Sequence, residues 1–331
     1  GICEWDATGH GTNVTGIIGA ETDNAIGIAG VNWDVAIIPM RIIWSNGYAY
    51  SSDLIAAIYD AANMGCKVIN LSLGGGTPSD SERAAVSYAV AKGCIVVAAA
   101  GNGGEISYNY PASYDGVISV ASIDINLNRS AFSQYNDRVA VAAPGQNIYT
   151  TAYWIKAQGK DYIYRDGTSF STPYVSGIAA LAAALKPSIT YDEFYNALIG
   201  SCTDLGVAGY DYYYGYGLID AEKLLLSIAN TLSYEITANA ASPKAGTVTG
   251  AGIYDYGSEV TLTAQAEMGY QFINWTENGA KVSTDPNFTF TVTANRNLTA
   301  NFEEDRSLYR SLDHKSNVVP AKNWLVKKNS R

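Results

Sequence analysis

The stretch Ile95-Val96-Val97-Ala98-Ala99-Ala100-Gly101-Asn102-Gly103 indicates the fold of the larger part of this 331-residue chain. Its apolar start shows no alternation, which is typical of a strand buried on both faces of a parallel sheet. The glycines that follow predict a sharp turn at the carboxyl end of the strand. Ligand sites of such sheets lie at these ends, so we expect the chemistry of the protein close to Asn102.

The segments before this strand follow the same plan. Apolar residues at helical spacing predict a helix from Asp53 to Met64, and the cap-like Ser51-Ser52-Asp53 starts it. The strand Val68 to Leu71 follows, and then a second helix from about Ser81 to Lys92. Helices that alternate with fully apolar strands predict an α/β fold with a doubly wound, mostly parallel sheet over residues 1–230.

The composition changes near Ser233. The stretches 260–264, 272–275 and 288–292 alternate in the period of a strand, so we expect a small β-rich domain at residues 234–303. Beyond Glu304 the chain loses periodicity and turns basic, which predicts a flexible tail at residues 304–331.

Charge and hydropathy exclude some functions. The net charge of −10 argues against a nucleic-acid partner, because phosphate binding needs clustered Lys and Arg. No apolar run is long enough for a membrane span. The four cysteines, Cys3, Cys66, Cys94 and Cys202, match no zinc motif, and we interpret them as small buried apolar residues. A Cys66–Cys94 disulfide is the alternative.

Histidine is scarce in this chain, which narrows the search for a general base. Of the two histidines, His314 falls in the basic tail, so His10 is the imidazole available to the folded region. It stands between Gly9 and Gly11, which leave the ring open to a partner. A surface or capping role is the alternative for a histidine at a helix start.

A candidate nucleophile opens the longest Ala-rich helical pattern. The segment Asp166-Gly167-Thr168-Ser169-Phe170-Ser171-Thr172-Pro173 leads into this pattern, which ends before Pro187. Ser169 is thereby placed at a helix N-terminus, where free N–H groups and the helix dipole favour a developing anion. The alternative is that Ser169 or Ser171 is merely an N-cap.

Asn102 is the candidate oxyanion donor. A glycine-flanked Asn at the end of a strand can direct its side-chain amide at an oxyanion, and the loss of such a donor costs roughly 10²–10³ in turnover. An Asn in a left-handed turn is the alternative.

Four motifs occur together and in order: Gly-His-Gly-Thr at 9–12, Asn-Leu-Ser-Leu-Gly-Gly-Gly at 70–76, Ala-Ala-Ala-Gly-Asn at 98–102, and Gly-Thr-Ser-x-Ser-Thr-Pro at 167–173. This ordered set resembles the subtilase family of serine proteases over residues 6–229. The resemblance implies that Ser169 attacks the peptide carbonyl, that His10 transfers the proton, and that Asn102 with the Ser169 N–H holds the oxyanion.

The resemblance also implies a substrate site. Residues 72–74 would pair with the substrate backbone as an added strand, and two glycines would line the primary specificity pocket. Small residues there favour a roomy pocket for large apolar side chains. The residues expected to bind substrate are Ser72, Leu73, Gly74, Gly101 and Gly103.

A structural calcium ion is a further implication, although the chemistry itself requires no cofactor. The segment 22–28 resembles the calcium loop of the family, with one extra residue, and a plain surface turn is the alternative. The expected ligands are Thr22, Asn24, Ile26 and Ile28.

The acidic member of the family's triad has no counterpart here. The family carries it in an Asp-Thr/Ser-Gly context well before the histidine, and the nine residues before His10 contain no such motif. Asp6 and Glu4 lie too close to His10 to reach the far ring nitrogen. We therefore expect an N-terminally truncated domain that lacks its first strand and that by itself has little or no activity.

Residues 234–303 resemble the divergent internalin-type B-repeat, on the stretches 246–252, 254–257, 269–275 and 298–302. This resemblance provides the alternative function, a catalytically dead surface or adhesion protein. Trp275, Tyr254 and Phe290 would form either a sugar-binding face or, as we favour, core. For the whole chain we expect protein or peptide substrates, a bacterial extracellular or cell-surface location, and association with the surface or wall through this module.

Overall fold

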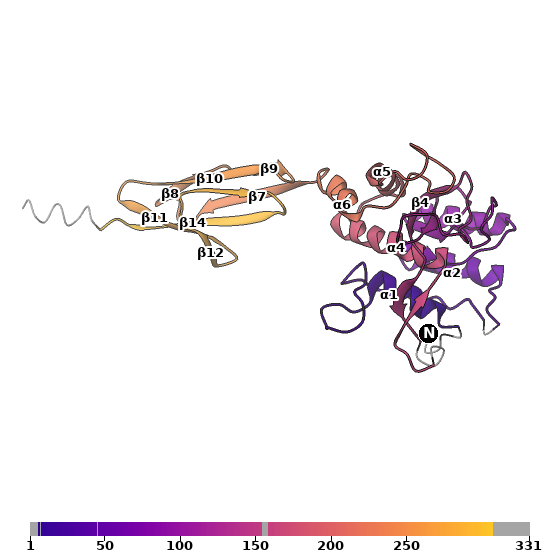
Figure 1. Ribbon diagram of the computed structural model, residues 1–331. Coiled ribbons are helices and arrows are strands. Elements are labelled where there is room, and N and C mark those ends of the chain that lie inside the picture. Colours follow the sequence, from indigo (N-terminus) through magenta and orange to yellow (C-terminus); the bar gives the residue numbers. More distant parts are fainter. Residues whose placement is uncertain (1–5, 7, 45, 154–157, 307–331) are drawn as a thin grey trace, which may run out of the picture. The chain divides into compact units, whose positions relative to one another are not determined.

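The computed structural model describes residues 6, 8–44, 46–153 and 158–306, and the chain falls into two compact units divided between Ala229 and Asn230 (Figure 1). The elements of the first unit are α1 (His10–Gly19), α2 (Ser51–Asn63), β1 (Val68–Leu71), α3 (Asp80–Ala91), β2 (Ile95–Ala99), β3 (Val117–Ile123), β4 (Val139–Pro144), β5 (Ile148–Thr151), β6 (Tyr162–Arg165), α4 (Thr168–Leu185), α5 (Tyr191–Ser201) and α6 (Ala221–Ala229).

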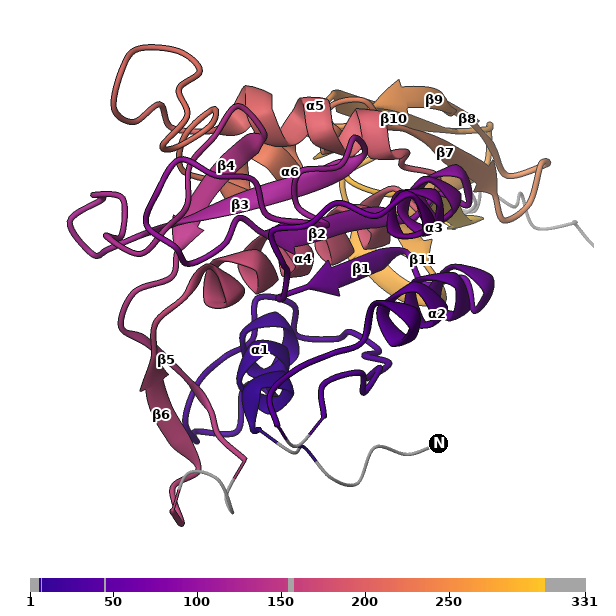
Figure 2. The same ribbon diagram turned by 90° about the vertical axis from the view of Figure 1, so that its right-hand side faces the viewer.

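A parallel four-stranded sheet in the order β1-β2-β3-β4 forms the centre of this unit (Figure 2). Ile95 and Val97 of β2 join the core that α4, α5 and α6 build on one face. Val96 and Ala98 join the core of α2 and α3 on the other face. β2 is apolar without interruption because helices cover both faces of the sheet, as the sequence predicted.

The helices largely match their sequence signals. α3 begins after Ser79, whose hydroxyl accepts the Glu82 N–H, and α5 begins with a complete capping box of Thr190 and Glu193. The start of α2 differs from the expectation: its N-cap is Tyr50, without a side-chain cap, and Ser51 is already helical. The helix predicted from Asp53 thus begins two residues earlier, at Ser51.

A two-stranded hairpin, β5–β6, lies against α1 and is joined to it by side chains. Asn13 donates from Nδ2 to the Thr151 carbonyl at 2.7 Å and receives the Thr150 hydroxyl on its own carbonyl at 2.6 Å. Gly16 is required at this contact, because a Cβ there would lie 2.0 Å from Oγ1 of Thr151. The hairpin leads directly into α4 and so connects the start of α1 with the start of α4.

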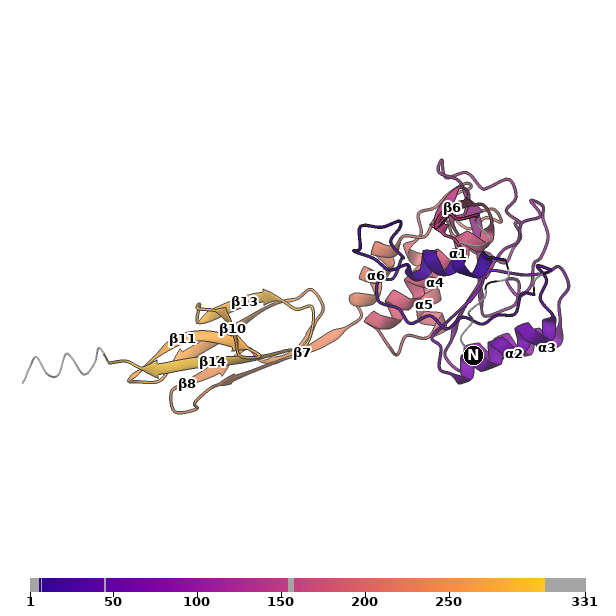
Figure 3. The same cartoon turned by 90° about the horizontal axis from the view of Figure 1, so that it is seen from below.

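The second unit is a β-sandwich (Figure 3). Its strands are β7 (Ser233–Ala240), β8 (Gly246–Thr249), β9 (Gly252–Asp255), β10 (Glu259–Ala266), β11 (Tyr270–Glu277), β12 (Ala280–Ser283), β13 (Asn287–Thr291) and β14 (Arg296–Glu304). They form one sheet in the order β13-β10-β8 and another in the order β12-β11-β14-β7-β9. Trp275 is fully buried between them, with Nε1 donating to the Asp285 carbonyl at 3.1 Å.

The predicted fold class, an α/β unit with a mostly parallel sheet followed by a small β-rich domain, is confirmed. Within the described residues, no helix is both long and apolar enough to cross a bilayer. Cys66, Cys94 and Cys202 are free thiols rather than disulfide partners, and Cys3 lies outside the described residues.

Candidate active site

The start of α4 presents Ser169 without using it as a cap. The N-cap is Gly167, which has φ of 145° and no side-chain cap, and Ser169 is the second residue of the helix. The alternative of Ser169 or Ser171 as an N-cap is therefore wrong. The Thr168 N–H is accepted by the neutral Asn102 side chain, whereas the Ser169 N–H has no partner among the described residues and stays available to an anion at the positive end of the helix dipole.

Asn102 is held in one orientation by the residue before the serine. Its Oδ1 accepts hydrogen bonds from the Thr168 N–H at 2.9 Å and from the Thr168 hydroxyl at 3.0 Å. The same hydroxyl accepts the Gly101 N–H at 3.2 Å. Because Oδ1 is engaged with Thr168, Nδ2 is left as the free donor, and it lies 3.6 Å from where a Cβ of Gly167 would stand.

Ser72 and Ser169 exchange two hydrogen bonds. The Ser72 hydroxyl donates to the Ser169 carbonyl at 2.8 Å, and the Ser169 hydroxyl donates to the Ser72 carbonyl at 3.1 Å. Asn70 supports this pair, since its Nδ2 donates to Ser72 Oγ at 2.9 Å and its Oδ1 accepts the Ser176 hydroxyl at 2.9 Å. The end of β1 is thus fastened to the first turns of α4.

His10 is brought to the same place by the packing of α1 against α4. It is the first residue of α1, and its ring contacts the Phe170 ring at 5.8 Å between centroids. No hydrogen bond joins the imidazole to Ser169 in the described part of the chain, since the Ser169 hydroxyl donates to Ser72 instead. Catalytic hydrogen bonds are often loose before substrate binds, so a rotation of the Ser169 side chain is the motion required.

Asp6 is occupied as the cap of α1. Its carboxylate accepts the Gly9 N–H at 2.8 Å, the Thr12 N–H at 2.8 Å and the Thr12 hydroxyl at 2.8 Å, and it also receives the Thr8 N–H at 3.3 Å. Burial raises the pKa of Asp6, but these hydrogen bonds outweigh it and hold that pKa below its ordinary value. A carboxylate committed to backbone N–H groups is a poor partner for an imidazole, in agreement with the expectation for Asp6. Glu4 lies outside the described residues.

The surroundings of His10 favour its neutral form. Burial lowers the pKa of His10, the negative charge of Asp6 opposes that shift, and the positive charge of Arg165 adds to it, with a net lowering. Arg165 ends β6, and its Nε donates to Asn13 Oδ1 at 3.3 Å, one turn of α1 beyond His10. A neutral imidazole is the form that can accept a proton from Ser169.

The two glycines expected to line the specificity pocket both contact Gln134. Its Oε1 accepts the Gly103 N–H at 3.1 Å, and a Cβ on Gly101 would lie 2.0 Å from the same oxygen. Gly101 has φ of 109°, which also favours glycine. The space beside these glycines therefore contains a polar carboxamide, where the small residues alone suggested apolar room.

The expected calcium loop forms an exposed turn. The Asn24 Oδ1 accepts the Ile26 N–H at 2.9 Å, and the Thr22 hydroxyl donates to the Ala20 carbonyl at 3.0 Å. Calcium takes six to eight oxygens, usually with carboxylates among them, whereas the predicted set offers only neutral oxygens. No cluster of three or more Asp, Glu, His or Cys side chains suited to a metal occurs in the described ranges. These residues do not complete a calcium site by themselves, and the calcium ion stays a prediction.

The structure thus brings His10, Ser72, Asn102 and Ser169 together and places the 22–28 loop elsewhere. Sequence analysis assigned no role to Thr168 or Gln134, which orient Asn102 and fill the space beside Gly101. Thr168 could have been found, because it stands inside the Gly-Thr-Ser motif. Gln134 belongs to no motif and is joined to its partner only by the fold.

The comparisons with known proteins agree with this geometry. Residues 4–217 match the model of the subtilase family, and residues 234–306 match that of the divergent InlB B-repeat domain. Subtilisin DY of Bacillus licheniformis is 38% identical over 221 residues, which cover 66% of this chain and 77% of that protein. Thermitase of Thermoactinomyces vulgaris is 40% identical over 218 residues, with coverage of 66% and 75%.

Comparison with a solved structure also finds a subtilisin-like protease. The psychrophilic subtilisin-like protease Apa1 from Pseudoalteromonas sp. AS-11 superposes with a TM-score of 0.61 at 26% identity. The match covers 65% of this chain and 83% of that one.

Proposed function

The chain belongs to the subtilase family of serine peptidases, and from this premise we propose that it cleaves peptide bonds as an endopeptidase through an acyl-enzyme. The Ser169 hydroxyl leaves the Ser72 carbonyl, turns to His10 and attacks the substrate carbonyl while His10 takes its proton. His10 then returns the proton to the leaving amine. A water molecule, activated in the same way, releases the acyl group.

One observation supports this proposal above the others, namely the fixed orientation of Asn102. With Oδ1 engaged by Thr168, the Nδ2 group and the N–H of Ser169 are the donors that remain for the oxyanion. Donors held in advance at the place where charge develops lower the barrier without reorganisation. A merely structural Asn in a turn would not need two hydrogen bonds from the residue next to the serine.

We expect the protein to act outside a bacterial cell, and this rests on the B-repeat match and on the kind of enzyme that its relatives are. The alternative, a catalytically dead surface or adhesion protein, rests on the same B-repeat unit. Association with the cell surface or wall belongs to either function. What separates them is whether Ser169 is activated.

Labelling of the full chain with a serine-directed fluorophosphonate tests the proposal. We expect labelling of the wild type that is lost in both Ser169→Ala and His10→Ala. In the described residues no carboxylate accepts a hydrogen bond from the imidazole, so labelling should be slow, by roughly 10⁴ relative to a complete triad.

Two matched variants control for folding. Ser171→Ala removes a neighbouring serine of α4 whose hydroxyl has no hydrogen-bond partner among the residues that the structure describes. His314→Ala removes the second histidine, and both variants should label as the wild type does. Equal labelling of all the variants, or none in the wild type, would refute an activated serine and favour the adhesion protein.

A further inference from the structure

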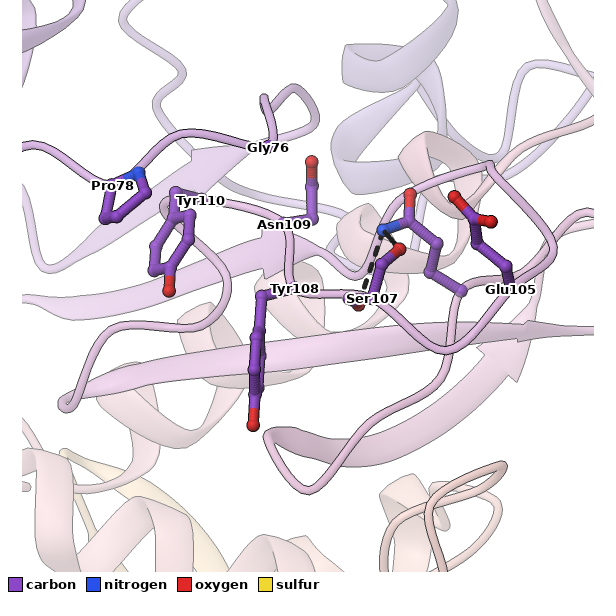
Figure 4. Close-up of a pocket in the computed structure, with 8 residues that line it drawn as sticks. Gly76, Pro78, Glu105, Ser107, Tyr108, Asn109 and Tyr110 are labelled. Atoms are coloured by element: carbon purple, nitrogen blue, oxygen red, sulfur yellow. Dashed lines mark hydrogen bonds between the residues drawn. The ribbon is translucent and has the colours of Figure 1, made fainter.

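A pocket of about 610 Å³ opens beside the candidate active site (Figure 4). The lining residues that matter here are Glu105, Ser107, Tyr108, Asn109, Tyr110 and Gln134. Figure 4 shows Glu105 and Tyr110 at opposite ends of the lining segment, with Tyr108 and Tyr110 on one side of it and Asn109 on the other. The pocket therefore combines a carboxylate, amides and aromatic rings.

The walls of this pocket touch the residues expected to hold the substrate. Asn109 lies against the strand of residues 72–74, because a Cβ on Gly74 would come within 2.2 Å of its Nδ2. Gly75 and Tyr110 exchange backbone hydrogen bonds at 2.7 and 2.9 Å, and Gln134 touches Gly101 as described above. A substrate backbone on residues 72–74 would place a side chain at this pocket.

The polar atoms left free in the pocket are mostly acceptors. Gln134 uses Nε2 to donate to the Ser107 hydroxyl at 2.8 Å, and Asn109 uses Nδ2 to donate to the Ala99 carbonyl at 2.8 Å. Asn109 Oδ1 accepts no hydrogen bond in the described residues, and Gln134 Oε1 accepts only the Gly103 N–H, which leaves it one lone pair. Such a lining suits a ligand that brings several N–H donors.

Glu105 adds a negative charge that nothing nearby neutralises. Its carboxylate has no ion pair or hydrogen bond within the described residues, while its backbone carbonyl is fixed by the Tyr135 N–H at 3.3 Å. No Lys, Arg or His lines the pocket. Arg138, whose charge acts on Tyr108, is engaged with Asp115 at 2.6 Å.

The tyrosines provide surface for an apolar stem. Tyr108 is 47% exposed, so its ring is open to a ligand, and its hydroxyl hydrogen bonds to Asp137. Tyr110 packs against Tyr114 with the rings tilted by 42° and 4.7 Å between their centroids, which holds it in place. The methylene stem of Lys or Arg packs well on such rings, and the cationic head is attracted to their faces.

We propose that this Glu105 pocket is a specificity subsite for a cationic substrate side chain, Lys or Arg, placed near the cleaved bond. The proposal rests on the proposed protease function and names its substrate class. The net charge of −10 acts in the same direction, because it attracts cationic chains to the surface. Neutral peptides bind without the contribution of Glu105.

Peptide binding to the full chain carrying Ser169→Ala tests the proposal, because this variant cannot consume its ligand. The probes are fluorescent hexapeptides of neutral background in which Lys, Arg, norleucine or Glu occupies each position in turn, and anisotropy gives their affinities. At one position Lys or Arg should bind roughly threefold to tenfold more tightly than norleucine, as expected of an exposed charge pair, and high salt should reduce the gain. The Lys and Arg arms show which cation is preferred.

Glu105→Gln in the same background should abolish the preference while leaving the norleucine peptide unchanged. Glu21→Gln, an exposed Glu outside the pocket, should keep the preference. Equal affinity for Lys and norleucine at every position, or an equal loss for all peptides in Glu105→Gln, would overturn the subsite. If wild-type chain labels with fluorophosphonate but shows no cationic preference, the subsite fails and the protease function stands. If neither labelling nor peptide binding occurs, both fail.

Discussion

Two helix starts meet at the candidate active site, and they are treated in opposite ways. α4 begins at Thr168 behind a glycine; the neutral Asn102 Oδ1 accepts the Thr168 N–H, and the Ser169 N–H has no partner in the described residues. α1 begins at His10, and the Asp6 carboxylate accepts the N–H groups of Gly9 and Thr12. One positive helix end is therefore left open for a substrate anion, while the other is neutralised inside the protein.

The difference lies in the acceptor: a neutral amide at the start of α4 leaves the Ser169 N–H and the positive helix end available, whereas a carboxylate neutralises the start of α1. At α4 the Ser169 N–H follows directly after Thr168, the residue that holds Asn102 Oδ1 and leaves Asn102 Nδ2 free. At α1 an open positive end would stand beside His10 and favour its neutral form too strongly for a base that must become protonated during the reaction. Asp6 reduces that effect, since its charge raises the pKa of His10.

A substitution of Asn102 is the most direct test of the arrangement at the start of α4. Asn102→Leu removes the Nδ2 donor with little change in volume, and we expect the rate of fluorophosphonate labelling to fall by roughly 10²–10³. The midpoint of thermal unfolding should also fall, because the variant removes Oδ1, the acceptor for the N–H and hydroxyl of the buried Thr168. An unchanged labelling rate would show that the amide does not serve an oxyanion.

Thr168→Val tests whether the orientation of that amide matters. The variant keeps the backbone N–H bond to Asn102 but loses the hydroxyl bond, and it leaves the buried Gly101 N–H without its acceptor. We expect labelling to slow about tenfold, which corresponds to the loss of one such hydrogen bond. Thr172→Val, one turn further along α4, is the matched control and should label at a rate closer to the wild type.

Removal of the Asp6 carboxylate tests the arrangement at the start of α1. Asp6→Ala should lower the free energy of unfolding by about 1 kcal/mol, as for the loss of a helix cap. The folded pKa of Asp6 is depressed, so its contribution is present above its ordinary pKa and lost as the pH falls through the folded value. Denaturant unfolding should therefore separate Asp6→Ala from wild type at pH 7 and bring the two together in strong acid.

Asp34→Ala is the control for this measurement, because Asp34 is an exposed carboxylate on a loop beyond α1. Its stability should equal that of the wild type at both pH values. A stability loss in Asp6→Ala that persists unchanged in strong acid would contradict a role for the charge.

The smallest expected effects are opposite shifts in the pKa of His10. Asp6→Asn removes a charge that raises this pKa and should lower it, whereas Arg165→Gln removes a charge that lowers it and should raise it. NMR titration can follow the ring directly, because the only other histidine can be removed with His314→Gln. Shifts of the same sign in both variants would refute the assignment of these charges.

The same titration bears on the pH dependence of the reaction. Labelling requires neutral His10, and burial holds its pKa below the ordinary value of a histidine. The rate should therefore rise with pH through a midpoint below 6.5. A midpoint above that value in the wild type would show that the imidazole is stabilised in its charged form.

Much of the fold was predictable because its signals are local. The apolar run of β2, the helical spacing of α2 and α3, and the Gly-Thr-Ser motif before α4 each lie within a few consecutive residues. The short span between Asp6 and His10 argued against a triad role for Asp6, but its hydrogen bonds at the start of α1 were not predicted. The start of α2 was misplaced because Tyr50, which has no capping side chain, took the N-cap position.

The sequence by itself determined which residue types stand at the ends of which elements, and so it singled out Ser169, His10 and Asn102 as candidates. Only the tertiary structure decided which atoms of these residues are free. Three contacts join segments that lie far apart in the chain. Asn102 Oδ1 accepts a hydrogen bond from Thr168, the Ser169 hydroxyl donates to the Ser72 carbonyl, and Gln134 fills the space beside Gly101. Their partners are set by the packing of α1, α4 and the sheet, and no local pattern encodes that packing.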